Sequence, residues 1–172
     1  MSRLLPPGYE WADALVVVKT YPAPSAKHGE TVCVAGARLD GPDAPSWIRL
    51  YPISFRALES DTQFKKYQRL RVPVRARGTY DPRPESYQPG IAGITPGDRY
   101  DTRKNWALRR ALIEPLIGAR TTCKLIELNQ GATMDQSVPS LGMVRAKVTD
   151  VGRPQELRPL AGRGLRLHEL GP

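Results

Sequence analysis

The stretch that decides the fold class is RLRVPVRARGTY, residues 69–80. Its even positions, from Leu70 to Ala76, carry apolar side chains. Its odd positions carry a row of four arginines, which are Arg69, Arg71, Arg75 and Arg77. A period of two is that of a half-buried strand, so we predict a strand with an arginine ladder on its open face. Pro73 falls on the arginine face and predicts that this strand lies at the edge of a sheet.

Further strands are predicted on both sides of this stretch. Residues 12–20 (ADALVVVKT) form a β-branched run, and residues 31–39 contain Gly36 as a candidate bulge. A turn rich in Gly, Asp and Pro joins the second run to residues 46–51, which predicts a β-hairpin. Three more runs are predicted as strands: 121–128, 142–151 and 165–170.

One helix and several irregular segments complete the prediction. Residues 102–117 carry apolar side chains at helical spacing, with Asp101-Thr102 as the N-cap and Gly118 as the end. Short helical turns are predicted at 52–58 and 61–66. Residues 81–101 are rich in Pro, Gly, Arg and Tyr and are predicted to form a long loop.

These elements predict a mainly β protein built as a small β-barrel, either a single barrel or two fused ones, with one central α-helix at about 102–117. Residues 1–12 are predicted to be an irregular arm, and residues 13–151 a single compact unit. Residues 152–172 form a basic segment rich in Pro, Gly and Arg.

The charge of the chain indicates a polyanionic partner. Lys and Arg number 26 against 17 Asp and Glu, a net charge of +9. Residues 45–110 hold fourteen basic and six acidic side chains, whereas the first 44 residues are almost neutral. A basic field of this kind attracts nucleic acid, and arginine suits phosphate well.

The two cysteines, Cys33 and Cys123, lie far apart and outside any metal-binding spacing, so neither a zinc site nor a disulfide framework is predicted. The N-terminus shows no apolar leader, and the longest apolar run, residues 14–18, is too short to span a membrane. The sequence therefore predicts a cytoplasmic protein without a membrane partner.

The chain contains six short, unusual motifs, and their order along the sequence is distinctive. They are VKTYP (18–22), ETVCVAG (30–36), WIRLYPISFR (47–56), KKYQ (65–68), DPRPESY (81–87) and SLG (140–142). In these motifs the chain resembles a poorly characterised family of small prokaryotic proteins described as dual OB-containing domains. The resemblance implies a pair of OB-like barrels and a nucleic-acid role, in some cases within defence or mobile-element assemblies. It implies no catalytic residue.

Basic and aromatic side chains predict a surface for nucleic acid, RNA or DNA, with single strands favoured. The alternatives are a proline-stiffened turn around Tyr21, and a solvated edge that prevents aggregation. The candidate contacts are Lys19, Tyr21, Lys27, Arg49, Tyr51, Arg56, Lys65, Lys66, Tyr67, Arg69, Arg71, Arg75, Arg77 and Arg83. Trp47 and Phe55 are assigned to the core.

Two other functions remain open, and other protein subunits are candidate partners. A metal-dependent nuclease would use Asp81 and Glu85, together with Glu30, although arginine pairs that brace the loop explain these carboxylates more simply. Cys33 with His28 and Glu30 would suit a nucleophile and base, but a thiol in an apolar strand is usually inert. An adaptor would dock an acidic protein. We favour a non-enzymatic binding protein with no catalytic residue, metal or cofactor.

Overall fold

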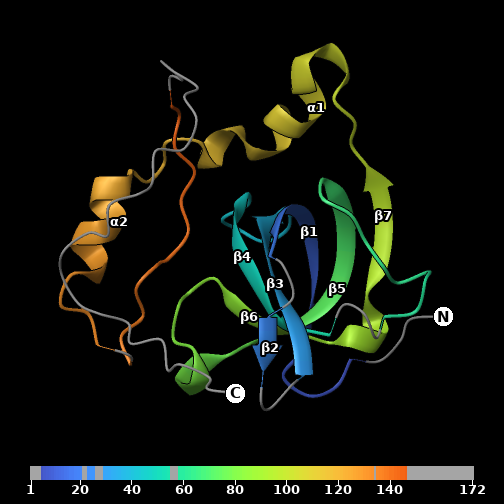
Figure 1. Ribbon diagram of the computed structural model, residues 1–172, viewed down its shortest axis with the longest axis horizontal. Coiled ribbons are helices and arrows are strands. Elements are labelled where there is room, and N and C mark those ends of the chain that lie inside the picture. Colours follow the sequence, from blue (N-terminus) through green and yellow to red (C-terminus); the bar gives the residue numbers. More distant parts are fainter. Residues whose placement is uncertain (1–4, 21–22, 26–28, 55–57, 134, 147–172) are drawn as a thin grey trace, which may run out of the picture.

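A closed five-stranded barrel of mixed strand directions forms the centre of the molecule (Figure 1). The computed structural model describes residues 5–20, 23–25, 29–54, 58–133 and 135–146. Around the barrel the strands run β1 (Glu10–Lys19), β3 (Gly29–Arg38), β4 (Ser46–Ile53), β6 (Ser86–Pro89) and β5 (Gln68–Ala76), and β5 pairs with β1 to close it. The β4–β6 pair is parallel and the others are antiparallel. The predicted mainly β class is confirmed, and the barrel is consistent with an OB-like one.

Smaller elements surround the barrel. Two short strands extend it: β2 (Ala23–Ser25) pairs with β3, and β7 (Thr95–Arg99) pairs with β5. The chain then forms helix α1 (Arg103–Ile113) and helix α2 (Thr122–Asn129). Single 3₁₀ turns lie at Gly78–Tyr80, Ile91–Gly93 and Glu114–Leu116. The helix predicted at 102–117 is therefore present as α1 followed by one 3₁₀ turn.

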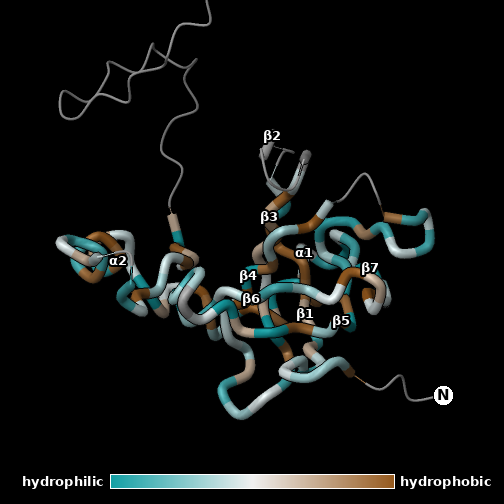
Figure 2. The backbone as a smooth tube through the Cα atoms, turned by 90° about the horizontal axis from the view of Figure 1, so that it is seen from below, coloured by the Kyte–Doolittle hydropathy of each residue, from teal (hydrophilic) through white to brown (hydrophobic). Residues whose placement is uncertain are grey.

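The barrel interior is the main hydrophobic core. Leu70, Val72 and Val74 of β5 are fully buried, while Arg69 and Arg71 are exposed, as the alternation of β5 predicts. Figure 2 shows apolar residues along the barrel strands. The other interior side chains come from the other long strands and from two connecting segments: Ala12, Ala14, Val16, Val32, Val34, Ile48, Leu50, Ile53, Leu58, Phe64 and Ile94.

A second apolar layer lies outside the barrel. Leu15 of β1 and Ala37 of β3 point outward and are fully buried beneath Ile113 and Leu116. This cover explains why residues 14–18 are continuously apolar rather than alternating, since this part of β1 is covered on both faces. Helix α1 and the turn after it thus protect the outer face of β1 and β3.

Strand β5 is not at an edge, contrary to the prediction from Pro73. It pairs with β1 on one side and with β6 and β7 on the other. Pro73 lies between the segments that pair with β6 and β7, and its carbonyl accepts a bond from Gly90 N at 2.7 Å. A gap between two partners therefore accommodates the proline.

The segment 81–101 is not one long loop, because it contains β6 and β7. Their Pro and Gly residues indicate a loop locally, but neighbouring strands supply the hydrogen bonds. The irregular arm is also shorter than predicted, since β1 begins at Glu10. The helical turn predicted at 52–58 is wrong at its start, because β4 continues to Ile53.

Two predicted strands are wrong in the C-terminal part. Residues 121–128 form α2, which begins where Thr121 accepts a bond from Lys124 N at 3.1 Å. An N-cap and good helix formers outweigh the apolar run here. Of 142–151, the described part contributes a single bridge, between Ile117 and Met143. The strand predicted at 165–170 lies outside the described residues.

Within the described ranges the strands form one barrel, not two. No helix in these ranges is long and apolar enough to cross a membrane.

Gly36 marks a close approach between strands, next to an irregularity in the β1–β3 pairing. Val16 pairs with Gly36 and Val18 pairs with Ala35, so the register shift leaves the extra residue in β1 and not at Gly36. A Cβ added to Gly36 would lie 2.1 Å from the carbonyl oxygen of Leu15, far inside van der Waals contact. Only glycine permits the observed distance between β3 and β1.

Gly36→Ala is expected to lower the free energy of unfolding by about 3 kcal/mol, the upper end for overpacking, because backbone atoms must move. Gly97→Ala is the control, since its Cβ would meet its nearest atom at an ordinary 3.5 Å. Urea denaturation measures both. A Gly36→Ala protein as stable as Gly97→Ala would contradict this account of the β1–β3 contact.

Candidate functional site

Three arginines converge where β4 passes the loop between β5 and β6. Arg49 lies on the outer face of β4, between the interior residues Ile48 and Leu50. Arg77 and Arg83 lie on the loop. The loop is held against β4 because Arg49 N donates to the carbonyl of Glu85 at 2.7 Å and Arg49 pairs in register with Ser86. We call Arg49, Arg77 and Arg83 the arginine cluster.

The Asp81 carboxylate organises the arginine cluster. Arg49 Nη1 donates to its Oδ2 at 2.7 Å, and Arg77 Nη1 approaches the same oxygen at 3.4 Å. Arg83 binds both oxygens, with Nε at 2.6 Å from Oδ1 and Nη2 at 2.8 Å from Oδ2. Ser86 Oγ donates to Oδ2 at 2.7 Å. Three positive charges thus surround one buried negative charge, which leaves an excess for an anion.

Tyr51 adds an aromatic ring to this group. It follows Arg49 by two residues on the same face of β4. The guanidinium carbons of Arg49 and Arg77 lie 5.4 and 5.2 Å from its ring centre. Cation–π contacts at these distances hold both arginines near the ring without neutralising them.

A cavity of about 610 Å³ opens above the arginine cluster. One side is the barrel, with the cluster, Tyr51 and Tyr80. The other side comes from Asn129 at the end of α2 and from the segment that follows it, including Gln136 and Ser140. Tyr80 is 88% exposed. The volume lies within the range typical of ligand sites, and its polar lining suits an anionic group beside a ring.

The pKa of Asp81 lies well below its ordinary value. Burial alone would raise it, because desolvation disfavours the charged form. The hydrogen bonds from Arg83 and Ser86, together with the charges of Arg83 and Arg49, outweigh burial. Asp81 therefore remains ionised and keeps the arginines in place.

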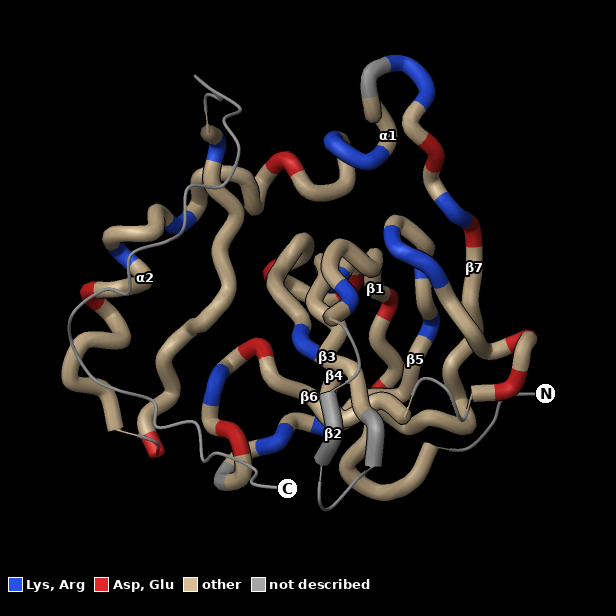
Figure 3. Tube along the Cα trace, in the orientation of Figure 1, with Lys and Arg blue, Asp and Glu red and all other residues tan. Residues whose placement is uncertain are grey.

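The ladder arginines of β5 have partners from the start of the chain and β1. Arg69 forms a bidentate ion pair with Asp13. Arg71 lies over the Trp11 ring at 5.0 Å, and Arg75 over the Tyr9 ring at 5.3 Å. These contacts offset the repulsion expected along the ladder. The row remains exposed, and Figure 3 shows its basic residues along β5.

The other predicted contacts lie apart from the arginine cluster. Lys65 and Lys66 are exposed before β5. Lys19 lies over the Phe64 ring at 5.9 Å, and burial followed by the charge of Lys66 lowers its pKa. One face of Tyr67 is covered by Arg109, 3.8 Å from the ring centre. Tyr21, Lys27, Phe55 and Arg56 lie outside the described residues.

Sequence reasoning missed the far wall of the cavity and Tyr80. Tyr80 ends the arginine-rich stretch and was the available signal, since it is an aromatic residue among basic ones. Nothing in residues 129–140 pointed to a site, because these residues reach the barrel only through tertiary packing. Trp47, assigned to the core, is partly buried.

The nuclease alternative gains no support from these contacts. Both Asp81 oxygens are bound by arginines, as the bracing interpretation predicts. Glu85 instead accepts bonds from the backbone N and Oγ of Ser140, at 2.7 and 2.6 Å. No three His, Cys, Asp or Glu side chains in the described ranges are grouped as a metal site. Cys33 is partly exposed, while His28 and the Glu30 side chain lie outside the description.

Asp81→Asn is expected to destabilise the protein at pH 7 by roughly 2 kcal/mol or more, because the arginines lose their counter-charge. A carboxyl whose pKa is lowered on folding stabilises above its unfolded pKa of about 3.9 and loses that contribution as the pH falls. The difference in the free energy of unfolding between wild type and Asp81→Asn should therefore become smaller below about pH 4. Urea unfolding at pH 7, 5 and 3 measures it. The exposed Asp98→Asn is the control, and a difference independent of pH would contradict the assignment.

One comparison with known proteins identifies a family. No curated protein and no solved structure matches the chain. Residues 10–115, more than half of the chain, match DUF8758, which is described as a domain of unknown function. This range contains the seven strands of the described residues, together with α1 and the arginine cluster, and ends before α2. The chain therefore belongs to the DUF8758 family.

Proposed function

We propose that this protein binds single-stranded nucleic acid at the arginine cluster and does so without catalysis. The observation that carries the proposal is the cavity in which Arg49, Arg77 and Arg83 meet Tyr51 and Tyr80. Phosphate requires cationic donors in a fixed arrangement, and a base requires a ring face. The cavity offers both within one space.

The position of the cavity on the barrel supports the same function. In OB-folds, oligonucleotides bind across the second and third strands and the loops joining strands one to two and four to five. Counted along the chain, the second and third barrel strands are β3 and β4, and the loop from the fourth to the fifth is 77–85. Arg49 and Tyr51 lie on β4, and the rest of the cluster lies on that loop. This agreement also favours the likeness to dual OB-containing domains, which we retain as part of the proposal.

The charges favour nucleic acid over an acidic protein partner. Three cations and one carboxylate line the cavity, beside two tyrosines. The acidic side chains of a protein partner would satisfy the cations, but Asp and Glu themselves offer no flat ring for the exposed Tyr80. RNA or DNA satisfies both groups, and a role as one subunit of a prokaryotic nucleoprotein assembly is compatible with a chain of this size.

Fluorescence anisotropy with labelled oligothymidylate is the test. Three phosphate contacts predict that the association constant falls about 20-fold between 50 and 200 mM salt. Arg83→Gln should reduce the slope of log K against log salt by about 0.7. Tyr80→Ala should instead weaken binding by about 1–3 kcal/mol while leaving the slope unchanged, because it removes stacking and not charge.

Arg99→Gln is the matched control, because Arg99 is exposed on β7, on the side of the barrel away from the loop 77–85 (Figure 1). It should change affinity less than Arg83→Gln. Absence of binding at 50 mM salt, or equal effects of the two substitutions, would overturn the proposal.

A further inference from the structure

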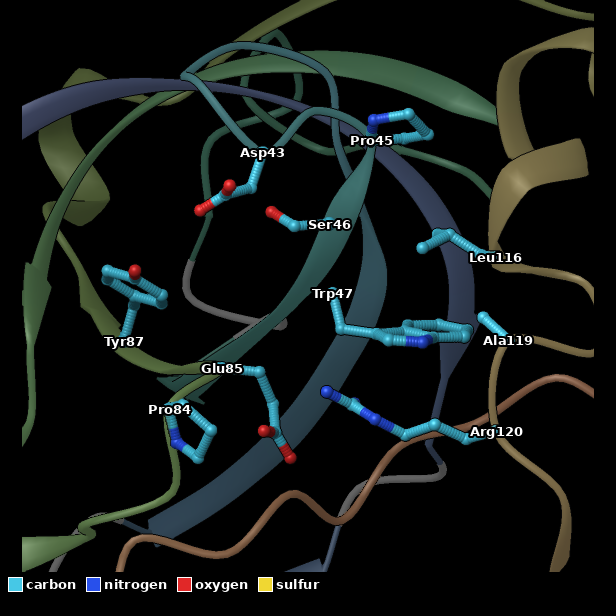
Figure 4. Close-up of a pocket in the computed structure, with 10 residues that line it drawn as sticks. All are labelled: Asp43, Pro45, Ser46, Trp47, Pro84, Glu85, Tyr87, Leu116, Ala119 and Arg120. Carbon is cyan, nitrogen blue, oxygen red and sulfur yellow. The ribbon is translucent and has the colours of Figure 1, made fainter.

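A second cavity, of about 540 Å³, has Glu85 in its wall (Figure 4). Its barrel wall carries Trp47 from β4, Glu85 from the position before β6, and Tyr87 from β6. Its outer wall includes Leu116 and Arg120, from the segment between α1 and α2. In Figure 4 the Glu85 carboxylate and the Arg120 guanidinium extend into the same space, with the Trp47 indole beside them.

Glu85 is the unusual group in this cavity. Its side chain is buried, with 4% of the residue exposed. Ser140 satisfies Oε1 with two hydrogen bonds, but Oε2 is buried and has no hydrogen-bond partner among the described residues. A buried acceptor without a partner is costly, and more so when it carries charge. A donor from outside the chain would remove this cost.

The surrounding side chains restrict what that donor belongs to. Trp47 is only partly buried, so a flat ring has an aromatic surface to pack against. Arg120 Nη1 donates to the carbonyl of Leu141 at 3.3 Å, which fixes the arginine while its remaining donors point into the cavity. The ligand that fits these side chains is a planar ring with an N–H donor for Glu85 and a neighbouring acceptor for Arg120.

We infer that this cavity binds a nucleobase that carries an exocyclic amino group, with the amino group donating to Glu85 Oε2. Cytosine, adenine and guanine present such a group beside a ring acceptor, whereas uracil and thymine do not. A carboxylate is a recognised acceptor for the cytosine amino group. The inference rests on the proposed function and adds a base preference to it.

The two cavities share a wall, which suits one nucleotide chain. Ser140 lines the first cavity and donates to Glu85, which lines the second. The first cavity has more positive than negative side chains, whereas the second is lined by the acidic Asp43 and Glu85 and the basic Arg120. Phosphates would therefore prefer the arginine cluster, and an amino-bearing base would prefer the second cavity.

The test uses nucleotide pairs that differ chiefly in the amino group: CMP against UMP, and GMP against IMP. Dissociation constants are measured by NMR from the three tryptophan indole N–H signals, and Trp47→Phe assigns the signal of Trp47. We expect each amino-bearing nucleotide to bind about tenfold or more tightly than its partner and to shift the Trp47 signal. Equal affinities within both pairs, or no shift of Trp47, would overturn the inference.

The Glu85→Gln variant tests whether this carboxylate causes the preference for amino-bearing nucleotides. It should reduce the affinity ratio of each pair to about twofold or less, while the exposed Glu59→Gln keeps the wild-type ratio. A preference that persists in folded Glu85→Gln would overturn the inference. If Glu85→Gln does not fold, the wild-type ratios and the Trp47 shift still decide the question.

Oligothymidylate separates this inference from the proposed function, because thymine has no amino group. Salt-dependent binding of oligothymidylate with equal affinities within both nucleotide pairs would overturn the base preference and leave the arginine cluster as a phosphate site. Failure of oligothymidylate to bind would overturn the proposed function, whatever the mononucleotides do.

Discussion

Hydrogen bonding between β1 and β5 closes the barrel, and the rest of the structure depends on this closure. Strand β5 is bonded on both sides within the closed barrel, so one of its faces, with Leu70, Val72 and Val74, fills the interior, and its arginines lie on the other face. The outward face of β1 then supplies Trp11 and Asp13 as their partners. Closure also places β6 between β5 and β4, and this forces the loop 77–85 to cross the outer face of β4. The arginine cluster is a consequence of that crossing.

The long strands were predictable because their patterns are local. Burial on one face gives β5 its period of two, and burial on both faces gives β1 its continuous apolar run. Strands β6 and β7 were not predictable, since they are four and five residues long and contain Pro or Gly, and pairing with neighbouring strands holds them. Helix α2 has an apolar stretch that resembles a strand. The N-cap residue Thr121 was the local sign of a helix, but the apolar pattern favoured a strand.

The candidate site was predictable in its residues but not in its grouping. Arg49, Tyr51, Arg77 and Arg83 all stood out as basic or aromatic residues in a basic region. Their meeting point depends on the parallel β4–β6 pairing, which joins Arg49 to Ser86 across 37 positions. No sequence period reports such a contact. The cavity walls from residues 116–140 were hidden for the same reason, because they approach the barrel only in the folded chain.

Asp81 and Glu85 show how two nearby carboxylates acquire different roles. Asp81 has both oxygens bound by arginine, so its charge is used within the fold to position cations. Glu85 has one oxygen bound by Ser140 and one without a partner among the described residues, so part of its hydrogen-bonding capacity is left for a ligand. The barrel side of both cavities lies within residues 10–115, whereas the outer walls come from residues after that range. The family domain therefore supplies the charged and aromatic surface, and the segment that follows it encloses that surface as two cavities.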